Sequence, residues 1–137
     1  MIAASALLFR VGEHLYGCDI ADAQEIIPLR PMTRLPGAPA FVRGLINMRG
    51  TIVTVFDLGL RLDPSRSPVT EGSILLVRYH DRVVGVIVEE VADVRALDVE
   101  SRDDGGNDGI VRGVAMTDGA PVVLLEFETM IKQVLLS

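Results

Sequence analysis

The sequence is poor in the residue types that build metal centres and catalytic sites. It has one cysteine, Cys18, and two histidines, His14 and His80. A single cysteine excludes an internal disulfide and favours a cytoplasmic protein. The two histidines fall in predicted turns of different hairpins, and no group of His, Cys and carboxylate residues has the spacing of a metal site. We therefore expect a protein that is not an enzyme and that uses no cofactor and no metal.

Long apolar runs and an excess of positive charge are also missing. No apolar stretch approaches the roughly 18 residues that a membrane-spanning helix needs, and no signal peptide is recognisable. We therefore expect no direct membrane insertion. Thirteen basic and nineteen acidic residues give a net charge of −6. This balance argues against a nucleic-acid partner, which needs clustered positive charge.

The charge that is present is unevenly distributed. Arg30, Arg34, Arg43 and Arg49 lie within twenty residues of one another, whereas the acidic residues concentrate in the second half. Arginine is well suited to forked, charge-assisted recognition of carboxylates. A protein-binding module is therefore better supported than an enzyme.

The pattern of apolar residues predicts a mainly β protein. With 137 residues, 49% of them hydrophobic, the chain is expected to form a single domain over residues 1–137. Short apolar runs separated by turn residues indicate about nine or ten strands in a barrel or sandwich. The clearest expected strands span 6–11, 15–20, 51–58, 73–79, 83–88, 89–94, 110–116 and 121–127. Residues 59–72 and 102–109 are expected to be loops, the second a candidate for disorder.

Two short helices are expected beside the strands. Asp19 can cap a helix over 20–27, because Ile20, Ala23 and Ile27 would share one face. At the carboxyl end, the spacing i, i+3, i+4, i+7, i+8 predicts an amphipathic helix, formed by Phe127, Met130, Ile131, Val134 and Leu135.

The stretch 43–50 (RGLINMRG) is the most distinctive local feature. Its glycines permit a sharp corner just before an apolar strand expected to be core throughout, so Arg49 would be held rigidly at that corner. Arg49 is then either a contact for a partner protein or one half of a structural salt bridge, for example with Asp57. The spacing alone favours neither reading.

The ordered set of motifs resembles the CheW family of chemotaxis coupling proteins. The matching motifs extend over essentially the whole chain: Tyr16-Gly17, Gln24-Glu25-Ile26, Leu35-Pro36, 42–50 (VRGLINMRG), 55–58 (VFDL), 84–88 (VGVIV), 90–94 (EVADV) and the final helix. The resemblance implies two packed, five-stranded, SH3-like β-barrel subdomains that are interleaved along the chain. It also implies a non-catalytic adaptor between methyl-accepting chemoreceptors and a CheA-type histidine kinase, recruited from the cytoplasm to membrane-associated arrays.

The resemblance also implies which residues meet the partners. In the family, the arginine of the N-x-R-G turn, here Arg49, is implicated in receptor contact, and Gly44 and Arg43 belong to the same neighbourhood. A helix expected at Ala23, Gln24, Glu25 and Ile26 is implicated in contacts with receptor and kinase. The expected partners are the kinase regulatory domain, the cytoplasmic receptor tip and other CheW-like domains of the array.

Some positions depart from the family pattern. Thr54 stands where proline is usual in the core strand, and Glu89 where aspartate is common. These departures leave three alternatives open: a paralogue in a surface-motility or developmental pathway, a decoy that binds receptor but not kinase, and a regulatory-domain fragment of a CheA-like kinase.

Overall fold

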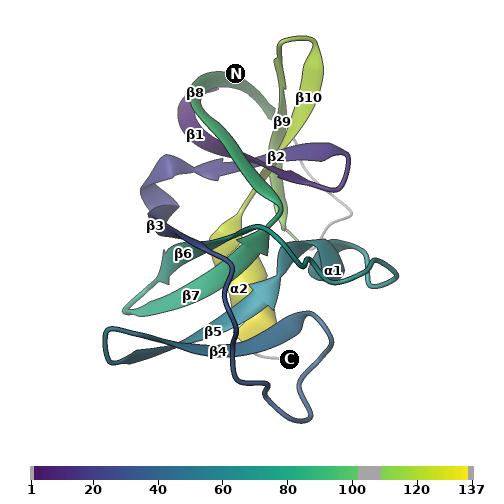
Figure 1. Cartoon of the computed structure of the whole chain (residues 1–137). Coiled ribbons are helices and arrows are strands. Elements are labelled where there is room, and N and C mark those ends of the chain that lie inside the picture. Colours follow the sequence, from purple (N-terminus) through teal and green to yellow (C-terminus); the bar gives the residue numbers. More distant parts are fainter. Residues whose placement is uncertain (1, 102–108, 136–137) are drawn as a thin grey trace. The chain divides into compact units, whose positions relative to one another are not determined.

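The structure, a computed structural model, describes residues 2–101 and 109–135. Ten strands, two α-helices and one 3₁₀ turn lie in this part of the chain (Figure 1). The residues divide into two compact units. Unit 1 contains Met1–Asp22 and Val91–Ser137, and unit 2 contains Ala23–Glu90. Unit 1 is therefore assembled from the two ends of the chain.

Unit 1 is a closed five-stranded barrel with the strand order β1-β2-β10-β9-β8. Antiparallel pairing joins β1 to β2 and β9 to both β8 and β10, whereas β2 and β10 run parallel. The unit also holds the 3₁₀ turn η1 and the helix α2. The bounds are β1 (Ile2–Val11), β2 (His14–Asp19), η1 (Ile20–Asp22), β8 (Glu90–Ser101), β9 (Val111–Thr117), β10 (Ala120–Leu125) and α2 (Phe127–Leu135).

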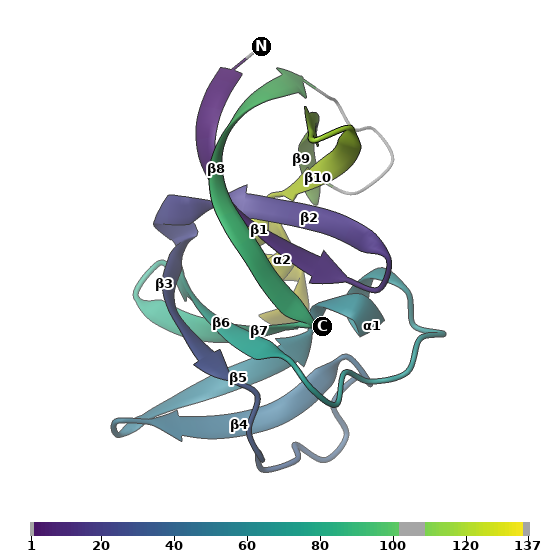
Figure 2. The ribbon, with the colours of Figure 1, turned by 45° about the horizontal axis from the view of Figure 1, so that its top comes forward.

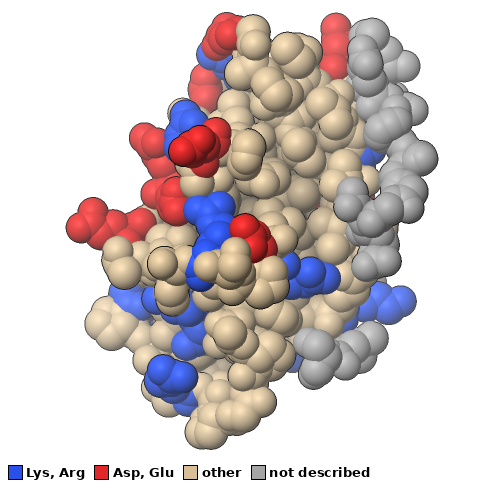
Figure 3. Space-filling view, turned by 90° about the vertical axis from the view of Figure 1, so that its right-hand side faces the viewer, with Lys and Arg blue, Asp and Glu red and all other residues tan. Residues whose placement is uncertain are grey.

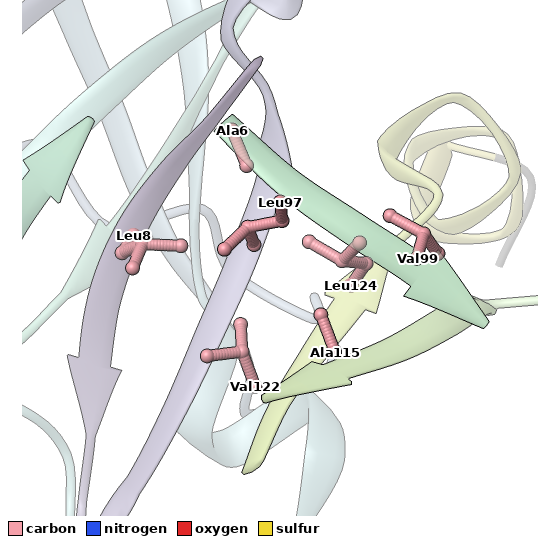
Figure 4. Packing of buried hydrophobic residues seen from close by; sticks show 7 residues of the cluster. All are labelled: Ala6, Leu8, Leu97, Val99, Ala115, Val122 and Leu124. Atoms are coloured by element: carbon pink, nitrogen blue, oxygen red, sulfur yellow. The ribbon is translucent and has the colours of Figure 1, made fainter. Parts of the chain in front are cut away.

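The barrel interior is filled by aliphatic side chains from alternate positions of its strands, as the two-residue period of a strand requires. Figure 4 shows these side chains converging inside the barrel. On α2, Phe127 stacks on Phe9 of β1 with ring centroids 6.0 Å apart. The buried cluster comprises Ala6, Leu8, Leu97, Val99, Ala115, Val122 and Leu124.

Unit 2 is a five-stranded sheet with the order β3-β6-β7-β5-β4. Its two ends approach each other, because Thr33, shortly after β3, pairs with Leu45 of β4 through two backbone hydrogen bonds of 2.9 and 2.8 Å. Figure 2 shows the connection that leads from β3 round to β4. The bounds are β3 (Ala23–Pro28), β4 (Val42–Met48), β5 (Thr51–Asp57), α1 (Leu58–Leu62), β6 (Ser73–Tyr79) and β7 (Arg82–Val88).

The core of unit 2 comes from all five strands. The central strands β6 and β7 bury residues on both faces, whereas the edge strand β3 alternates between half-buried and exposed positions. These patterns are those of central and edge strands. The buried cluster comprises Ile46, Val53, Val55, Val69, Ile74, Leu76 and Ile87, with Ile27 and Met32 packed against it.

The prediction of a mainly β chain with two five-stranded units and a carboxyl-terminal helix is confirmed. The hairpin turns at His80 and at Asp118-Gly119 also form where expected, with positive φ angles of 57° at His80 and 51° at Asp118. The predicted loop over 102–109 lies outside the described residues except for Gly109.

The helix predicted over 20–27 is wrong. Asp19 does cap a turn, since its Oδ1 accepts a hydrogen bond from Ala21 N at 2.9 Å, but the turn ends at Asp22. Residues from Ala23 onward instead form β3, which pairs with β6. The neighbouring β-branched residues Ile26 and Ile27 suit a strand, and the backbone partners in β6 supply the hydrogen bonds that a helix would otherwise make.

Two details between β5 and β6 also differ from expectation. The expected strand 51–58 stops at Asp57, and the helix α1 follows inside what was predicted to be a loop. Asp57 is the N-cap of α1, with its Oδ1 accepting a hydrogen bond from Leu60 N at 3.2 Å. Ile52, expected in the core, is 61% exposed, because the core positions of β5 are Val53 and Val55.

Candidate protein-binding site

The turn between β4 and β5 presents Arg49 to solvent. Met48 pairs with Thr51, so Arg49 and Gly50 are the two loop residues of a tight hairpin, with φ angles of 53° and 89°. Two positive φ angles define a type I′ turn, in which asparagine and glycine are the preferred residues. Asn47 Oδ1 accepts a hydrogen bond from Gly50 N at 2.8 Å and supports the turn. An arginine in this conformation is uncommon and strained, and such strain often marks a functional position.

Arg49 forms an ion pair with Glu25 of β3. Its Nη2 donates to both carboxylate oxygens, at 3.0 Å to Oε1 and 2.8 Å to Oε2. The side chains are 70% and 39% exposed respectively. Exposed pairs of this kind add at most about 1 kcal/mol to stability. The suggested structural pairing of Arg49 with Asp57 is therefore wrong, and the pair that does form leaves the guanidinium accessible.

The four predicted contact residues at the start of β3 lie on a strand edge, not on a helix. A β-bulge shifts the register between Ala23 and Glu25, so that Ala23 pairs with Val77 and Glu25 with Leu76. Gln24 is exposed, and with its amide oriented to satisfy its neighbour it accepts a hydrogen bond from Arg78 Nε at 3.1 Å. Ile26 is 44% exposed. The structure thus brings Glu25 together with Arg49 and leaves Ile26 as an apolar residue on the adjoining face of β3.

Ile52 is a surface residue of this region that sequence reasoning missed. It lies two residues beyond the Arg49-Gly50 turn, where Ile52 pairs with Asn47 across the hairpin. Its outward position follows from alternation along β5, because Val53 and Val55 face the core. An isoleucine in the outward phase of a half-buried strand was the available signal, but the continuous apolar run concealed it.

Arg43 lies at the opposite end of β4, about 20 Å from Arg49 along the strand at about 3.3 Å per residue. Its Nη1 donates to Asp57 Oδ2 at 3.0 Å and to the carbonyl oxygen of Val69 at 2.9 Å. Asp57 is fully buried and also accepts from Val69 N at 3.0 Å. A buried carboxylate needs this number of donors to offset its lost hydration. Arg43 is therefore in part structural.

Gly44 is buried and allows a close approach of two backbone segments. Its φ is +150°, and a Cβ at this position would lie 2.3 Å from the carbonyl oxygen of Thr33 and 3.0 Å from Met32 Cγ. The glycine is thus required by the pairing of Thr33 with Leu45. The structure places Gly44 under the 29–41 connection and away from the Arg49 turn, so these two predicted residues do not form one surface.

The described residues contain no group of three or more His, Cys, Asp or Glu side chains that could hold a metal ion. Cys18 is buried, and desolvation, followed by the nearby Asp22 and Asp19 charges, raises the pKa of its thiol from 9.0 to about 12. A thiol in that state is a poor nucleophile. Among the described helices, none is long and apolar enough to cross a membrane. The site therefore offers recognition by shape and charge.

Known proteins share both this sequence and this fold. The family model for the CheW-like domain matches residues 5–135. The chemotaxis protein CheW of Rhizobium meliloti is 31% identical over 130 residues, which cover 90% of this chain and 84% of that protein. The chemotaxis protein CheW of Klebsiella aerogenes is 36% identical over 95 residues, covering 69% of this chain and 57% of that protein.

Similarity extends to a solved structure. The crystal structure of the scaffolding protein TtCheW from Thermoanaerobacter tengcongensis superposes with a TM-score of 0.81 at 28% identity. The superposition covers 92% of this chain and 86% of that chain. With the family model matched over nearly the whole length and both five-stranded units present, the chain is a member of the CheW-like domain family.

Proposed function

We propose that the protein is a non-catalytic adaptor that couples methyl-accepting chemoreceptors to a CheA-type histidine kinase. Family membership supports this role, and the Arg49 turn is the observation that carries it at the level of residues. The turn holds an accessible guanidinium in a strained conformation whose structural return is small, since its ion pair with Glu25 is exposed.

In this proposal Arg49, Glu25 and Ile26 form the contact surface for receptor or kinase. Ile26 supplies exposed apolar area, and Arg49 supplies donors for carboxylates or backbone carbonyls of a partner. Gln24 and Ala23 border this surface on β3, and Ile52 extends it beyond the turn. Individual contacts of this size are weak. Repetition across an array of receptors recruited at the membrane would supply the holding strength through multivalency.

The direct test is reconstitution of kinase activity. Candidate receptors in membranes and a CheA-type kinase are combined with and without this protein, and the rate of kinase autophosphorylation is measured. An adaptor raises the rate in a receptor-dependent manner. A decoy binds receptor in a pull-down experiment yet lowers the rate. Absence of binding to both receptor and kinase would contradict the proposal.

A further inference from the structure

Unit 2 contains a groove whose lining is basic and has no acidic residue. The groove has a volume of about 650 Å³ and lies between the 30–43 segment and the 60–68 segment. Arg30, Arg34, Arg43 and Arg66 line it, together with five prolines and several aliphatic side chains. In a chain of net charge −6, four arginines around one groove without an acid in the lining is an unusual concentration of positive charge.

The charge of the unit supports the same point. Unit 2 has eight basic and seven acidic residues, whereas unit 1 has five basic and twelve acidic residues. In Figure 3, blue basic side chains lie close together over the surface of unit 2, with few red acidic side chains among them. The excess of negative charge in the protein is thus kept away from the segments that form the groove.

The arginines of the groove differ in how their charge is used. Arg43 is neutralised by buried Asp57, and Arg66 Nη2 lies 3.3 Å from Glu89 Oε2. Arg30 Nη2 donates to the carbonyl oxygen of Asn47 at 2.7 Å, which leaves its charge uncompensated. Arg34 is exposed and makes no ion pair within the described residues. Two guanidinium charges therefore remain for a ligand.

The walls of the groove are held in place before any ligand arrives. The Thr33–Leu45 pairing fixes the 29–41 connection against β4, and Asp57 N donates to the carbonyl oxygen of Phe41 at 2.7 Å. The guanidinium of Arg61 lies 5.8 Å above the Phe41 ring and joins α1 to the same connection. A groove that is already ordered loses little conformational entropy on binding, which favours affinity.

We propose that this groove binds an extended acidic segment of a partner protein, with its carboxylates on Arg30 and Arg34 and its aliphatic side chains against Met32, Val42 and Leu60. Guanidinium groups pair well with carboxylates, and the aliphatic lining matches side chains that a nucleic acid lacks. The net negative charge of the protein also opposes a dense polyanion. This surface is additional to the Arg49 surface at the other end of β4.

The test uses a fluorescein-labelled peptide of alternating glutamate and leucine residues and a matched peptide of alternating glutamine and leucine residues. Fluorescence anisotropy of the full chain at low salt should show binding of the glutamate peptide with a Kd of about 100 μM or below. The Arg34→Glu and Arg30→Glu variants should each weaken binding by about tenfold or more, because each removes a charge-assisted contact. Arg82→Glu, an exposed substitution outside the groove, should leave the affinity unchanged.

Several outcomes would overturn the proposal. These are equal binding of the two peptides, equal affinity of Arg34→Glu and Arg82→Glu, or equally tight binding of a single-stranded DNA of the same length. Self-association in sedimentation velocity that Arg34→Glu abolishes would also overturn it, because the occupant would then be a second copy of this chain. Arg49→Asn should bind the peptide normally, so failure here is distinguishable from failure of the adaptor proposal. Unchanged thermal unfolding of each variant confirms that the groove is still folded.

Discussion

Asp57 and Arg43 are joined by a 3.0 Å ion pair in which the carboxylate is fully buried and the guanidinium is half-buried. The same carboxylate caps α1 and accepts a hydrogen bond from Val69 N. One side chain therefore connects β4, the start of α1 and the end of the following loop.

Replacing Asp57 with alanine is expected to destabilise the protein strongly. The substitution leaves Arg43 without its anion and leaves two backbone N–H groups without their acceptor, which typically costs about 3–5 kcal/mol. Urea unfolding followed by circular dichroism measures the change in free energy. Asp57→Asn is the matched control, because it keeps hydrogen-bonding atoms and loses only the charge, so its effect should be clearly smaller. Equal effects of the two variants would contradict the role given to the ion pair.

Replacing Gly44 with alanine should reduce stability by about 2–4 kcal/mol, from backbone strain plus the clash with the Thr33 carbonyl. Gly37→Ala is a matched control in the same connection. Gly37 also has a positive φ, of 81°, but no atom lies within 4 Å of a Cβ there. It should therefore lose only about 1 kcal/mol. Thermal and urea unfolding measure both, and similar losses would show that the close approach is unimportant.

Replacing Arg49 with asparagine separates a contact residue from a structural one. Asparagine followed by glycine suits the type I′ turn, so the loss of an exposed ion pair should be offset and the free energy of unfolding should change by less than about 0.5 kcal/mol. Receptor or kinase pull-down should nevertheless fall by about tenfold.

A charge exchange provides the control for Arg49. Glu25→Arg combined with Arg49→Glu can rebuild the ion pair with its ends reversed. If this double variant restores partner binding, the pair serves only to hold β3 and the turn together, and the contact assignment is wrong. We expect binding to stay low, because a partner would meet the opposite charge.

Asp22 is expected to make stability depend on pH. Desolvation, then the charges of Asp19 and Glu126, raises the pKa of the Asp22 carboxyl above its ordinary 3.8, with Arg112 opposing. An acid with a raised pKa in the folded state opposes folding once it ionises, so its contribution worsens as the pH rises through that value. Asp22→Asn should therefore be slightly more stable than the wild type at pH 7.5, and the gain should vanish below the unfolded pKa. Urea unfolding across this pH range measures the difference, and a gain that persists at low pH would exclude ionisation as its cause.

Cys18 should react slowly with thiol reagents in the native protein. Its pKa of about 12 makes the thiolate fraction at neutral pH about a thousandfold lower than that of a thiol with a pKa of 9.0, and the side chain is buried as well. Reaction with a chromogenic disulfide at pH 8 should be slow in buffer and rapid in denaturant. Rapid reaction in buffer would mean that β2 opens readily.

The parts of the fold that sequence predicted well depend on local signals. Arg49-Gly50 between two apolar runs fixes a hairpin, and the apolar spacing from Phe127 fixes α2. The helix predicted over 20–27 failed because eight residues can satisfy a period of 3.6 and a period of 2 equally well. What decides between them is the pairing of β3 with β6, about fifty residues away.

The salt bridges show the same division between local and distant information. Counting back from the two-residue turn places Phe56 opposite Val42, so the Arg43–Asp57 pair was within reach of the sequence once the register of β4 and β5 was considered. The Arg49–Glu25 pair was not, because it depends on how β3 at one edge of the sheet curves toward the β4–β5 turn at the other. Twenty-four residues of chain without a recognisable period separate these two side chains.

The parallel pairing of β2 with β10 has a consequence for synthesis on the ribosome. Residues Ala23–Glu90 form a contiguous unit and can fold as soon as they emerge, whereas β2 lacks its neighbour until Val122–Leu124 has been translated. The first strands must therefore wait, with their apolar faces uncovered, through the synthesis of about a hundred residues. At about 5–20 residues per second this interval lasts from about 5 to 20 seconds. The amino-terminal hairpin is thus the segment that most needs protection by chaperones during expression.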